Sequence, residues 1–486
     1  MNPSLANLIC ACGIAGLFYL NRDDSVRTSK ALWLPVSYLW FIGSRPVSVW
    51  LGMTPPSGTN VQLEGSPLDA LFFALLLAAA LVVLIRRGKR TRCFLTANWP
   101  ILIYFFFCLI SVTWAYYPDV AFKRWIKAIG DLAMVLIILT DGQPVAALRR
   151  LISRVGFLLL PTSVLFIKYY GDLGRGYTPD GEQMNVGVST NKNSLGLIVL
   201  VVSLVTLWNV RSLLIHKDEP NRGRRLVAQG TLLAFGLALF GMANCATCIA
   251  CFIIGGGLIL ATGLRAIRSR PARVHALCLT IVLVGGGISL FGGQAGVVHA
   301  LGRDTTLSGR TEIWAAVIPA VPNPVVGAGF ESFWIGPDVQ KVYRSLEGWW
   351  DPQGINEAHD GYIEIYLNLG WIGVCLIALI LITGYRHASR AFQRDPELGS
   401  LFLAYVLTGA IYSITEAGFR FLSLSWIFLL LAVVGASGVA AGFFDDGTRQ
   451  ICSSRGATAA SDTIRRKRQA VDTASPTSVR KSSATR

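Results

Sequence analysis

The sequence predicts an all-α polytopic membrane protein. Of its 486 residues, 53% are hydrophobic and only 15% are charged. Apolar runs recur along most of the chain, and a helix needs about 20 such residues to cross a bilayer, which leads us to expect about 12–13 transmembrane helices. This composition excludes an ordinary soluble enzyme.

Thirteen apolar windows are the expected spans, with boundaries accurate to within several residues. No basic flank precedes the first window and no convincing cleavage site follows it, so we interpret it as a retained span. The windows lie near residues 5–20, 31–51, 67–85, 99–116, 126–140, 152–168, 194–210, 226–243, 247–263, 274–291, 362–384, 400–414 and 421–439.

Positive charge predicts the orientation of these spans. Of the 44 Lys and Arg residues, 32 fall in alternate connections or after residue 440. Cytoplasmic loops retain Lys and Arg, so the opposite, periplasmic side carries the longest connection, 291–361. The net charge of +16 then belongs to the cytoplasmic face and tail. Attraction to anionic lipid headgroups accounts for it without a nucleic acid partner.

Three regions follow from this organisation. We expect residues 1–444 to form the transmembrane domain, with 291–361 as a large periplasmic loop containing short helices. Residues 445–486 are rich in Ser, Thr, Ala and Arg and poor in large apolar side chains. Such a composition predicts a basic, disordered cytoplasmic tail.

Basic residues on the outer side are candidates for binding an anionic headgroup, because positive charge is under-represented there. Several flank span ends, in SRPVSVW (44–50), FKRWIK (122–127) and STNKNSLG (189–196). The alternative is that each snorkels or caps a helix, which we favour for Lys127 and Lys168. The candidate substrate-binding residues from this set are Arg45, Arg124, Arg175, Lys192 with its neighbour Asn193, and Arg420.

The outer loop contains GRDTTLSGRTEIW (302–314), in which Ser308 can cap a helix with Arg310 in its first turn. A helix start and a guanidinium together favour phosphate binding, because both supply directed donors. Phe330, Phe333 and Trp334 follow a Pro- and Gly-rich turn, and we expect them at the membrane interface as an aromatic belt.

His359 is the candidate general base. A neighbouring carboxylate such as Asp360 can orient an imidazole and raise its basicity, as deprotonation of a sugar hydroxyl requires. If the following segment is helical, Asp360, Glu364 and Asn368 share one stripe, which we interpret as the wall of a site that binds substrate. The alternative for a single loop histidine is a surface residue.

The cysteines and acidic residues give no sign of a metal. The ten cysteines lie mostly within apolar runs, which argues against a disulfide framework. Cys245, Cys248 and Cys251 have helical spacing but no partnering histidine, so we interpret them as packing residues. With neither a Cys/His cluster nor a carboxylate pair at ligand spacing on the outer side, we predict no metal and no cofactor.

These motifs together resemble the O-antigen ligase and Wzy-type polysaccharide polymerase superfamily, especially its exopolysaccharide-polymerase branch. The similarity rests on His359 followed by ten residues and Gly370, on Gly309 to Trp314 with NPVVGAGFESFW (323–334) behind it, and on Lys192-Asn193. The first two, in this order in a large outer loop, are the more specific.

The resemblance implies a GT-C-like membrane glycosyltransferase of the bacterial inner membrane whose active site faces the periplasm. Such an enzyme joins a glycan from an undecaprenyl-pyrophosphate carrier to an acceptor sugar without metal or nucleotide. His359 would then deprotonate the acceptor hydroxyl, and Arg310 would stabilise the leaving pyrophosphate. A chain-length regulator and a flippase would be its functional partners.

Two departures from the family pattern matter. The family's Ser-Arg-Thr-like segment is Cys245-Ala246-Thr247 here, so a second arginine is missing, and Lys192, Arg124 or Arg175 could replace it. The usual His-Asn is His359-Asp360. We expect a polymerase of lipid-linked repeats; the alternatives are a ligase that transfers finished chains to lipid A core, or a flippase, which would need charged residues through both membrane halves.

Overall fold

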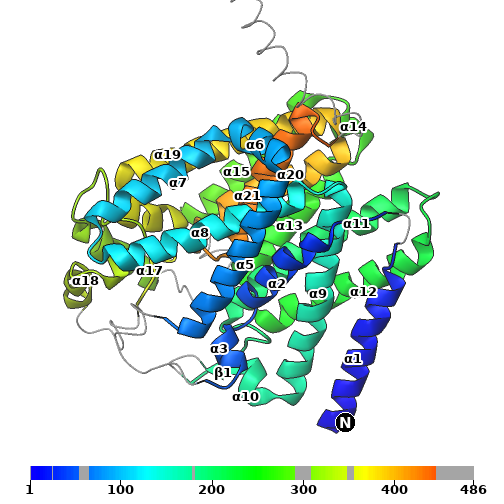
Figure 1. Cartoon of the computed structure of the whole chain (residues 1–486), viewed down its shortest axis with the longest axis horizontal. Coiled ribbons are helices and arrows are strands. Elements are labelled where there is room, and N and C mark those ends of the chain that lie inside the picture. Colours follow the sequence, from blue (N-terminus) through cyan, green and yellow to red (C-terminus); the bar gives the residue numbers. More distant parts are fainter. Residues whose placement is uncertain are drawn as a thin grey trace, which may run out of the picture. The chain divides into compact units, whose positions relative to one another are not determined.

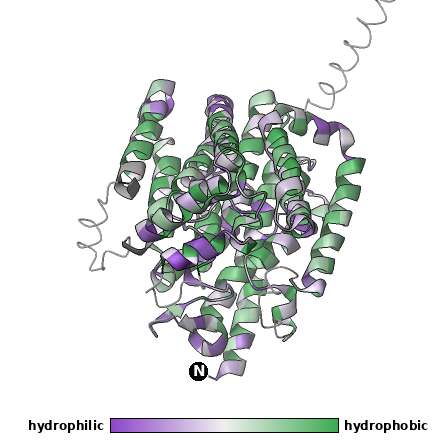
Figure 2. Ribbon diagram, turned by 90° about the vertical axis from the view of Figure 1, so that its left-hand side faces the viewer, coloured by the Kyte–Doolittle hydropathy of each residue, from purple (hydrophilic) through white to green (hydrophobic). Residues whose placement is uncertain are grey.

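The computed structural model describes residues 2–23, 26–53, 65–177, 181–290, 308–346 and 355–444, and it confirms an all-α polytopic fold. Within these ranges the strands are limited to one short antiparallel pair, β1 (Arg175–Tyr177) and β2 (Gln183–Asn185). Most of the helical ribbon is coloured as hydrophobic in Figure 2. The predicted tail, 445–486, lies outside the described residues.

The helices follow the predicted windows closely in most places (Figure 1). Their bounds are α1 Pro3–Leu20, η1 Lys30–Leu32, α2 Trp33–Ile42, α3 Val47–Trp50, α5 Pro67–Arg86, α6 Gly88–Ala97, α7 Trp99–Ser111, η2 Val112–Trp114, α8 Pro118–Leu139, α9 Pro144–Tyr169, α10 Gly171–Gly174, α11 Lys192–Ile215, α12 Arg222–Ala243, α13 Ala246–Ala261, α14 Arg265–Arg268, α15 Pro271–Leu290, α17 Ser308–Val317, η3 Ile318–Ala320, η4 Phe333–Ile335, α18 Val339–Ser345, α19 Gly361–Arg394, α20 Pro396–Tyr412 and α21 Leu424–Ala441.

Seven described helices are long and apolar enough to cross a membrane, or eight if the bent pair of α6 with α7–η2 counts as one span. This number is lower than the thirteen predicted windows. The window 31–51 is divided among η1, α2 and α3, with a break at Gly43 and Pro46. The helices α13 and α20 have only 16 and 17 residues, and α8 carries charged residues along its first half.

Two groups of packed helices meet around the site. In one group α11 packs against α9, α12 and α13, and in the other α19, α20 and α21 pack against one another. The helix α20 also contacts α13, which joins the groups. The fully buried Trp208 of α11 donates its indole N–H to the Glu397 carbonyl of α20, which also joins the two groups. The packed helices α19, α20 and α21 adjoin the segments that carry the polar residues of the site.

A break within α19 brings the large loop onto the helix. Gly370 has φ +61° and ψ −163°, so the α-helical hydrogen bonds are interrupted there. Amides of Trp371 and Ile372 instead donate to the carbonyls of Pro324 and Val325, at 2.9 and 3.2 Å. A Cβ at position 370 would lie 2.3 Å from the backbone of Val325. Glycine is therefore required at position 370, where α19 meets the NPVVGAGFESFW segment (323–334).

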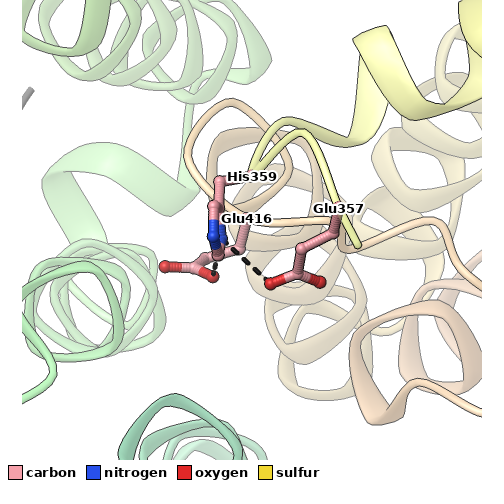
Figure 3. Close-up of side chains that lie close together, drawn as sticks. All are labelled: Glu357, His359 and Glu416. Carbon is pink, nitrogen blue, oxygen red and sulfur yellow. Dashed lines mark ion pairs between the residues drawn. The ribbon is translucent and has the colours of Figure 1, made fainter. Parts of the chain in front are cut away.

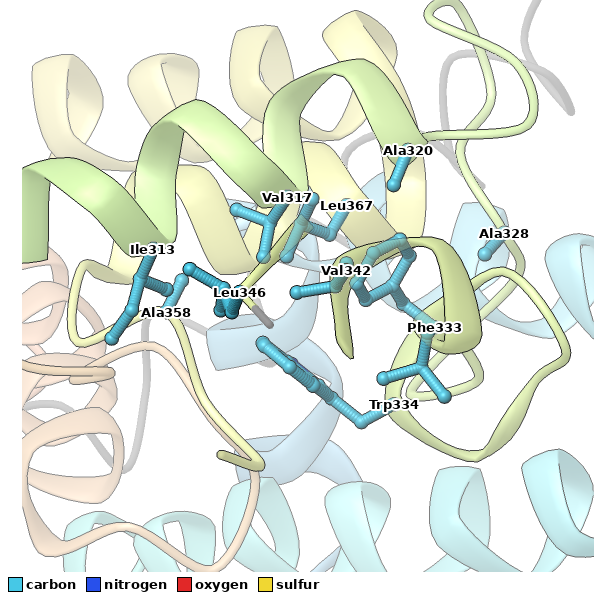
Figure 4. Packing of buried hydrophobic residues seen from close by; sticks show 11 residues of the cluster. Ile313, Val317, Ala320, Ala328, Phe333, Trp334, Val342, Leu346, Ala358 and Leu367 are labelled. Carbon is cyan, nitrogen blue, oxygen red and sulfur yellow. The ribbon is translucent and has the colours of Figure 1, made fainter. Parts of the chain in front are cut away.

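The loop has a hydrophobic core of its own (Figure 4). Ile313 and Val317 of α17 pack with Phe333, Trp334 and residues of α18. The predicted aromatic belt is wrong: Phe330, Phe333 and Trp334 are 5%, 0% and 9% exposed. The reason is that the Trp334 indole N–H donates to the buried carboxylate of Glu364, which satisfies it inside the protein. The helix predicted from Ser308 does begin there.

Inter-residue contacts separate a large unit, Met1–Ala441, from Gly442–Arg486. The helices α11, α17, α19, α20 and α21 all lie in the large unit. The loop residues 291–307 and 347–354 lie outside the described part of the chain.

Candidate functional site

The segment before α19 holds His359 in a constrained backbone. Asp360 is the N-cap residue of α19, and its carboxylate accepts the amides of Tyr362 and Ile363 at 2.8 and 2.9 Å. On the N-terminal side of His359, the Ala358 amide donates to the Glu364 carboxylate. The carbonyl of Ala358 accepts the Trp314 indole N–H at 2.8 Å. His359, between these anchors, has φ +51°, an uncommon conformation for a residue with a Cβ. The fold therefore fixes where its side chain points.

His359 lies between two carboxylates (Figure 3). Its Nδ1 is 2.9 Å from Glu357 Oε1 and 4.0 Å from Glu416 Oε2. The contact with Glu357 is an ion pair rather than an aligned hydrogen bond. Glu357 comes from the segment before α19, whereas Glu416 comes from the connection between α20 and α21. Two parts of the chain that are far apart in sequence thus build one acid–histidine cluster.

The carboxylates determine the protonation of the cluster. Burial alone would lower the pKa of His359, but the contacts with Glu357 and Glu416 outweigh it and raise the pKa to about 9. Burial likewise opposes ionisation of Glu357, yet His359, Arg420 and Arg310 hold the pKa of that carboxyl below its usual value. Near neutral pH the cluster therefore contains an imidazolium that faces the ionised carboxylate of Glu357.

Two arginines hold the same carboxylates from outside the cluster. Arg310 donates from Nη1 to the Thr415 carbonyl and from Nη2 to Glu416 Oε1, the latter at 3.2 Å. Arg420 lies 3.7 Å from Glu357 Oε2 and 3.5 Å from Glu331 Oε2. Each arginine thus joins one of the glutamates beside His359 to another part of the chain.

A cavity of about 590 Å³ opens beside this cluster. Glu357, His359, Glu416 and Arg420 lie on one wall, and Asn191 to Ser194, the start of α11, lie on another. Asn193 donates to both oxygens of Glu416 at 3.3 and 3.4 Å. Ile42, Leu197, Ile198 and Leu424 give the remaining surface apolar character. The size and mixed lining suit a ligand with a charged group and an apolar part.

The structure brings together some of the predicted site residues and separates others. His359, Lys192, Asn193 and Arg420 line the cavity, and Arg310 contacts it through Glu416. Arg124 donates to the carbonyl of Glu331, whose carboxylate pairs with Arg420 of the cavity lining. Arg175 donates to the Ile167 carbonyl at 2.9 Å, and Arg45 donates to the Leu173 carbonyl, so both bind backbone carbonyls of residues outside the cavity lining.

The predicted polar stripe supports the loop rather than the cavity wall. Glu364 is 6% exposed and accepts from Trp334 and Ala358. Asn368 accepts the amides of Ser332 and Phe333 at 2.9 and 3.1 Å. Asp360 caps α19, and burial raises its pKa to about 6 against the effect of the two capping amides. These side chains position the segment that carries His359.

Sequence reasoning missed the acidic residues of the site. Glu357 is only two residues from His359 and could have been noticed beside Asp360. Glu416 and Glu331 lie in otherwise apolar or small-residue stretches, ITEAG and GFESF, on the predicted outer side. A single acidic residue at the end of a predicted span was the sequence signal that could have identified them as site residues.

Glu357, His359 and Glu416 are also a group that could hold a cation, because their ligand atoms lie within 4.8 Å of one another. The prediction that the outer side has no such cluster is therefore wrong, because Glu416 reaches Glu357 and His359 from a distant part of the chain. The donor set fits a divalent ion poorly, because Arg310 and Arg420 already bind both carboxylates. Absence of a metal stays a prediction.

The part of the chain that carries Arg310 and His359 is similar to known proteins. Residues 230–378, which include Arg310 and His359, match the family model described as O-antigen ligase. The exopolysaccharide production protein ExoQ of Rhizobium meliloti (strain 1021) is 27% identical over 311 residues, which cover 61% of this chain and 67% of the relative. The resemblance inferred from the motifs is thereby confirmed: the chain is similar to proteins of the O-antigen ligase and Wzy-like family.

Proposed function

We propose that the protein polymerises undecaprenyl-pyrophosphate-linked oligosaccharide repeats by metal-independent glycosyl transfer on the periplasmic face of the inner membrane. The observation that carries this proposal is the His359 imidazole between Glu357 and Glu416, at the edge of a cavity that also presents Lys192, Arg420 and a helix start. A base and an anion-binding wall are the two parts that such a transfer needs.

In this proposal the acceptor sugar hydroxyl approaches His359. Glu357 pairs with Nδ1, so the neutral imidazole has Nε2 as its acceptor atom, and Nε2 takes the proton as the hydroxyl oxygen attacks the anomeric carbon of the donor. The bond from that carbon to the carrier pyrophosphate breaks, and negative charge grows on the leaving phosphate. Glu357 stabilises the imidazolium that forms.

Lys192, Arg420 and the amides at the start of α11 are the proposed partners of the pyrophosphate. They face the same cavity, and a helix start supplies both donors and positive potential. Lys192 thus becomes the favoured substitute for the missing second arginine. Arg310 binds the Glu416 carboxylate in this structure. It would stabilise the negative charge on the leaving pyrophosphate, either beside Glu416 or by releasing Glu416 and binding the phosphate instead.

Transfer of finished chains by a ligase is the second candidate, and the match to a model described as O-antigen ligase favours it. The printed name of the relative, an exopolysaccharide production protein, favours the polymerase. The two activities share donor chemistry and differ in the acceptor.

One experiment tests the chemistry and separates the two candidates. A deletion strain is complemented with wild type or His359→Ala at matched membrane levels, and the lipid-linked glycans that accumulate are sized. We expect His359→Ala to accumulate single repeats, because loss of the base stops transfer while binding remains. Accumulated full-length chains would indicate a ligase, and normal polymer from His359→Ala would refute the assignment of the base.

A further inference from the structure

Two cysteine thiols touch each other directly behind the site. The helix α13 begins at Ala246, so Cys245 is its N-cap residue and Cys248 lies in its first turn. Their Sγ atoms are 2.6 Å apart, and the residues are 3% and 0% exposed. Sequence spacing had suggested three equivalent packing cysteines, but Cys251 is separate, with its sulfur 3.9 Å from the Thr408 carbonyl.

We propose that Cys245 and Cys248 form a disulfide in the folded protein. A Cys-x-x-Cys pair at a helix start is a reactive arrangement, because the helix end favours the thiolate. The contact with Cys248 holds the pKa of Cys245 below its usual value, although burial opposes this. The compartment also matters, and this step rests on the orientation proposed above: the connection between α12 and α13 would face the periplasm, where disulfides persist.

The reaction is exchange with the disulfide of a thiol oxidoreductase while the segment is still accessible during folding. The Cys245 thiolate attacks one sulfur of that disulfide, which forms a mixed disulfide and releases one thiolate of the oxidoreductase. The Cys248 thiolate then attacks the Cys245 sulfur and releases the second. Cys245 and Cys248 lose two electrons and two protons, and the oxidoreductase disulfide becomes two thiols.

The bond would strengthen the frame around the acid–histidine cluster. Cys245 and Cys248 pack on Gly196 of α11, where a Cβ would lie 2.6 Å from Cys245 Cβ. The hydroxyl of Thr247, between the cysteines, is 3.1 Å from that of Thr415, whose carbonyl accepts from Arg310. Linking the two cysteines therefore constrains the first turn of α13, which contacts the segment that carries Glu416 through Thr247 and Thr415.

Differential labelling tests the bond without any glycan-transfer assay. Membranes are treated with N-ethylmaleimide, the full-length protein is purified and denatured in the same reagent, and remaining sulfurs are labelled with a heavier maleimide after reduction. Peptide mass spectrometry should find the heavy label on Cys245 and Cys248 and the light label on Cys251. Light label on both Cys245 and Cys248 would overturn the proposal.

Thermal unfolding in detergent supplies the second readout. Reductant should lower the melting temperature of wild type and of the control Cys251→Ser. The shift should be smaller in the double variant Cys245→Ser, Cys248→Ser, which has no bond to lose. Equal shifts in all three proteins would show that this pair makes no stabilising bond. Neither readout depends on glycan transfer, so failure of the proposed enzyme activity would be seen separately.

Discussion

At the scale of single residues, the charge on His359 predicts an unusual pH profile. Its pKa is about 9, so only a small fraction is the neutral base at pH 7. A base works deprotonated, and we therefore expect kcat/KM to rise with pH through about 9. Glu357→Gln removes the nearest carboxylate, which should lower the pKa of His359 and move this rise to lower pH.

The measurement is the initial rate of polymer formation by proteoliposomes between pH 6 and 10. Asp172→Asn, which alters an exposed carboxylate on α10, is the control and should leave the profile unchanged. A rate that falls as pH rises through 9 would mean that the imidazolium is the active form.

The two contacts of the Arg310 guanidinium predict that lysine cannot replace this residue without loss of rate. Its two Nη atoms bind the Thr415 carbonyl and Glu416, and a lysine keeps the charge but cannot reach both partners in this way. We expect Arg310→Lys to lose roughly a hundredfold in rate, as expected for a donor that stabilises developing charge. A surface ion pair would contribute about 1 kcal/mol or less and would tolerate the change.

The assay is polymer yield in a deletion strain complemented at matched membrane levels. Arg344→Lys in α18 changes an exposed arginine in the same loop and is the matched control. Wild-type polymer from Arg310→Lys would leave Lys192 and Arg420 as the residues to vary next.

Residue types near the site could be read from the sequence, but their partners could not. His359 and Arg310 were identified because local spacing marks them, and the structure brings both next to Glu416. Glu416 itself lies 57 positions after His359, and no periodic pattern connects them. The aromatic residues were misplaced for the same reason, since nothing local indicates that Glu364 accepts the Trp334 indole N–H.

At the scale of elements, the break in α19 determines how loop and membrane helix fit together. Gly370→Ala places a side chain at φ +61° and a Cβ 2.3 Å from Val325 backbone, which cannot move as a flexible side chain would. With ψ −163° this backbone conformation is essentially restricted to glycine, and it costs about 1–3 kcal/mol for a residue with a Cβ. We expect a lower melting temperature and loss of most transfer activity, because the displaced segment also carries the capping and hydrogen-bonded residues around His359.

Gly241→Ala is the control for this substitution. Gly241 lies within α12, and a Cβ there would have no atom within 4 Å. Alanine in a helix interior is favoured over glycine by about 0.5–1 kcal/mol, so this variant should be as stable as wild type or more stable. Equal melting temperatures for Gly370→Ala and wild type would show that the break does not need glycine.

Helix positions were predictable because apolar windows and end signals are local properties. Thus α1, α5 and α12 start or end within a few residues of their windows, and α17 begins at Ser308. Breaks were less predictable: Gly43 and Pro46 divide one window, and Gly370 interrupts another without ending it. The break at Gly370 depends on what packs against the chain, because the amide of Ile372 donates to the Val325 carbonyl instead of to its own helix.

At the scale of the whole molecule, α11 connects the proposed outer site to the basic side. Its 24 residues span about 36 Å at 1.5 Å per residue, enough to cross the hydrocarbon core. Lys192 at its start lines the cavity, while its end leads into the Lys- and Arg-rich connection after Ile215. Since such connections stay in the cytoplasm, the cavity and the large loop should face outward.

Substituted cysteines test this orientation. Lys341→Cys in α18 replaces a side chain that is 63% exposed, and Arg270→Cys replaces an exposed residue in a basic connection. A membrane-impermeant maleimide added to intact spheroplasts should label Lys341→Cys above the parent protein, and should label Arg270→Cys only after the membrane is permeabilised. The reverse pattern would place the His359 cavity in the cytoplasm, where a periplasmic polymerase could not work and the basic connections would contradict the usual charge asymmetry.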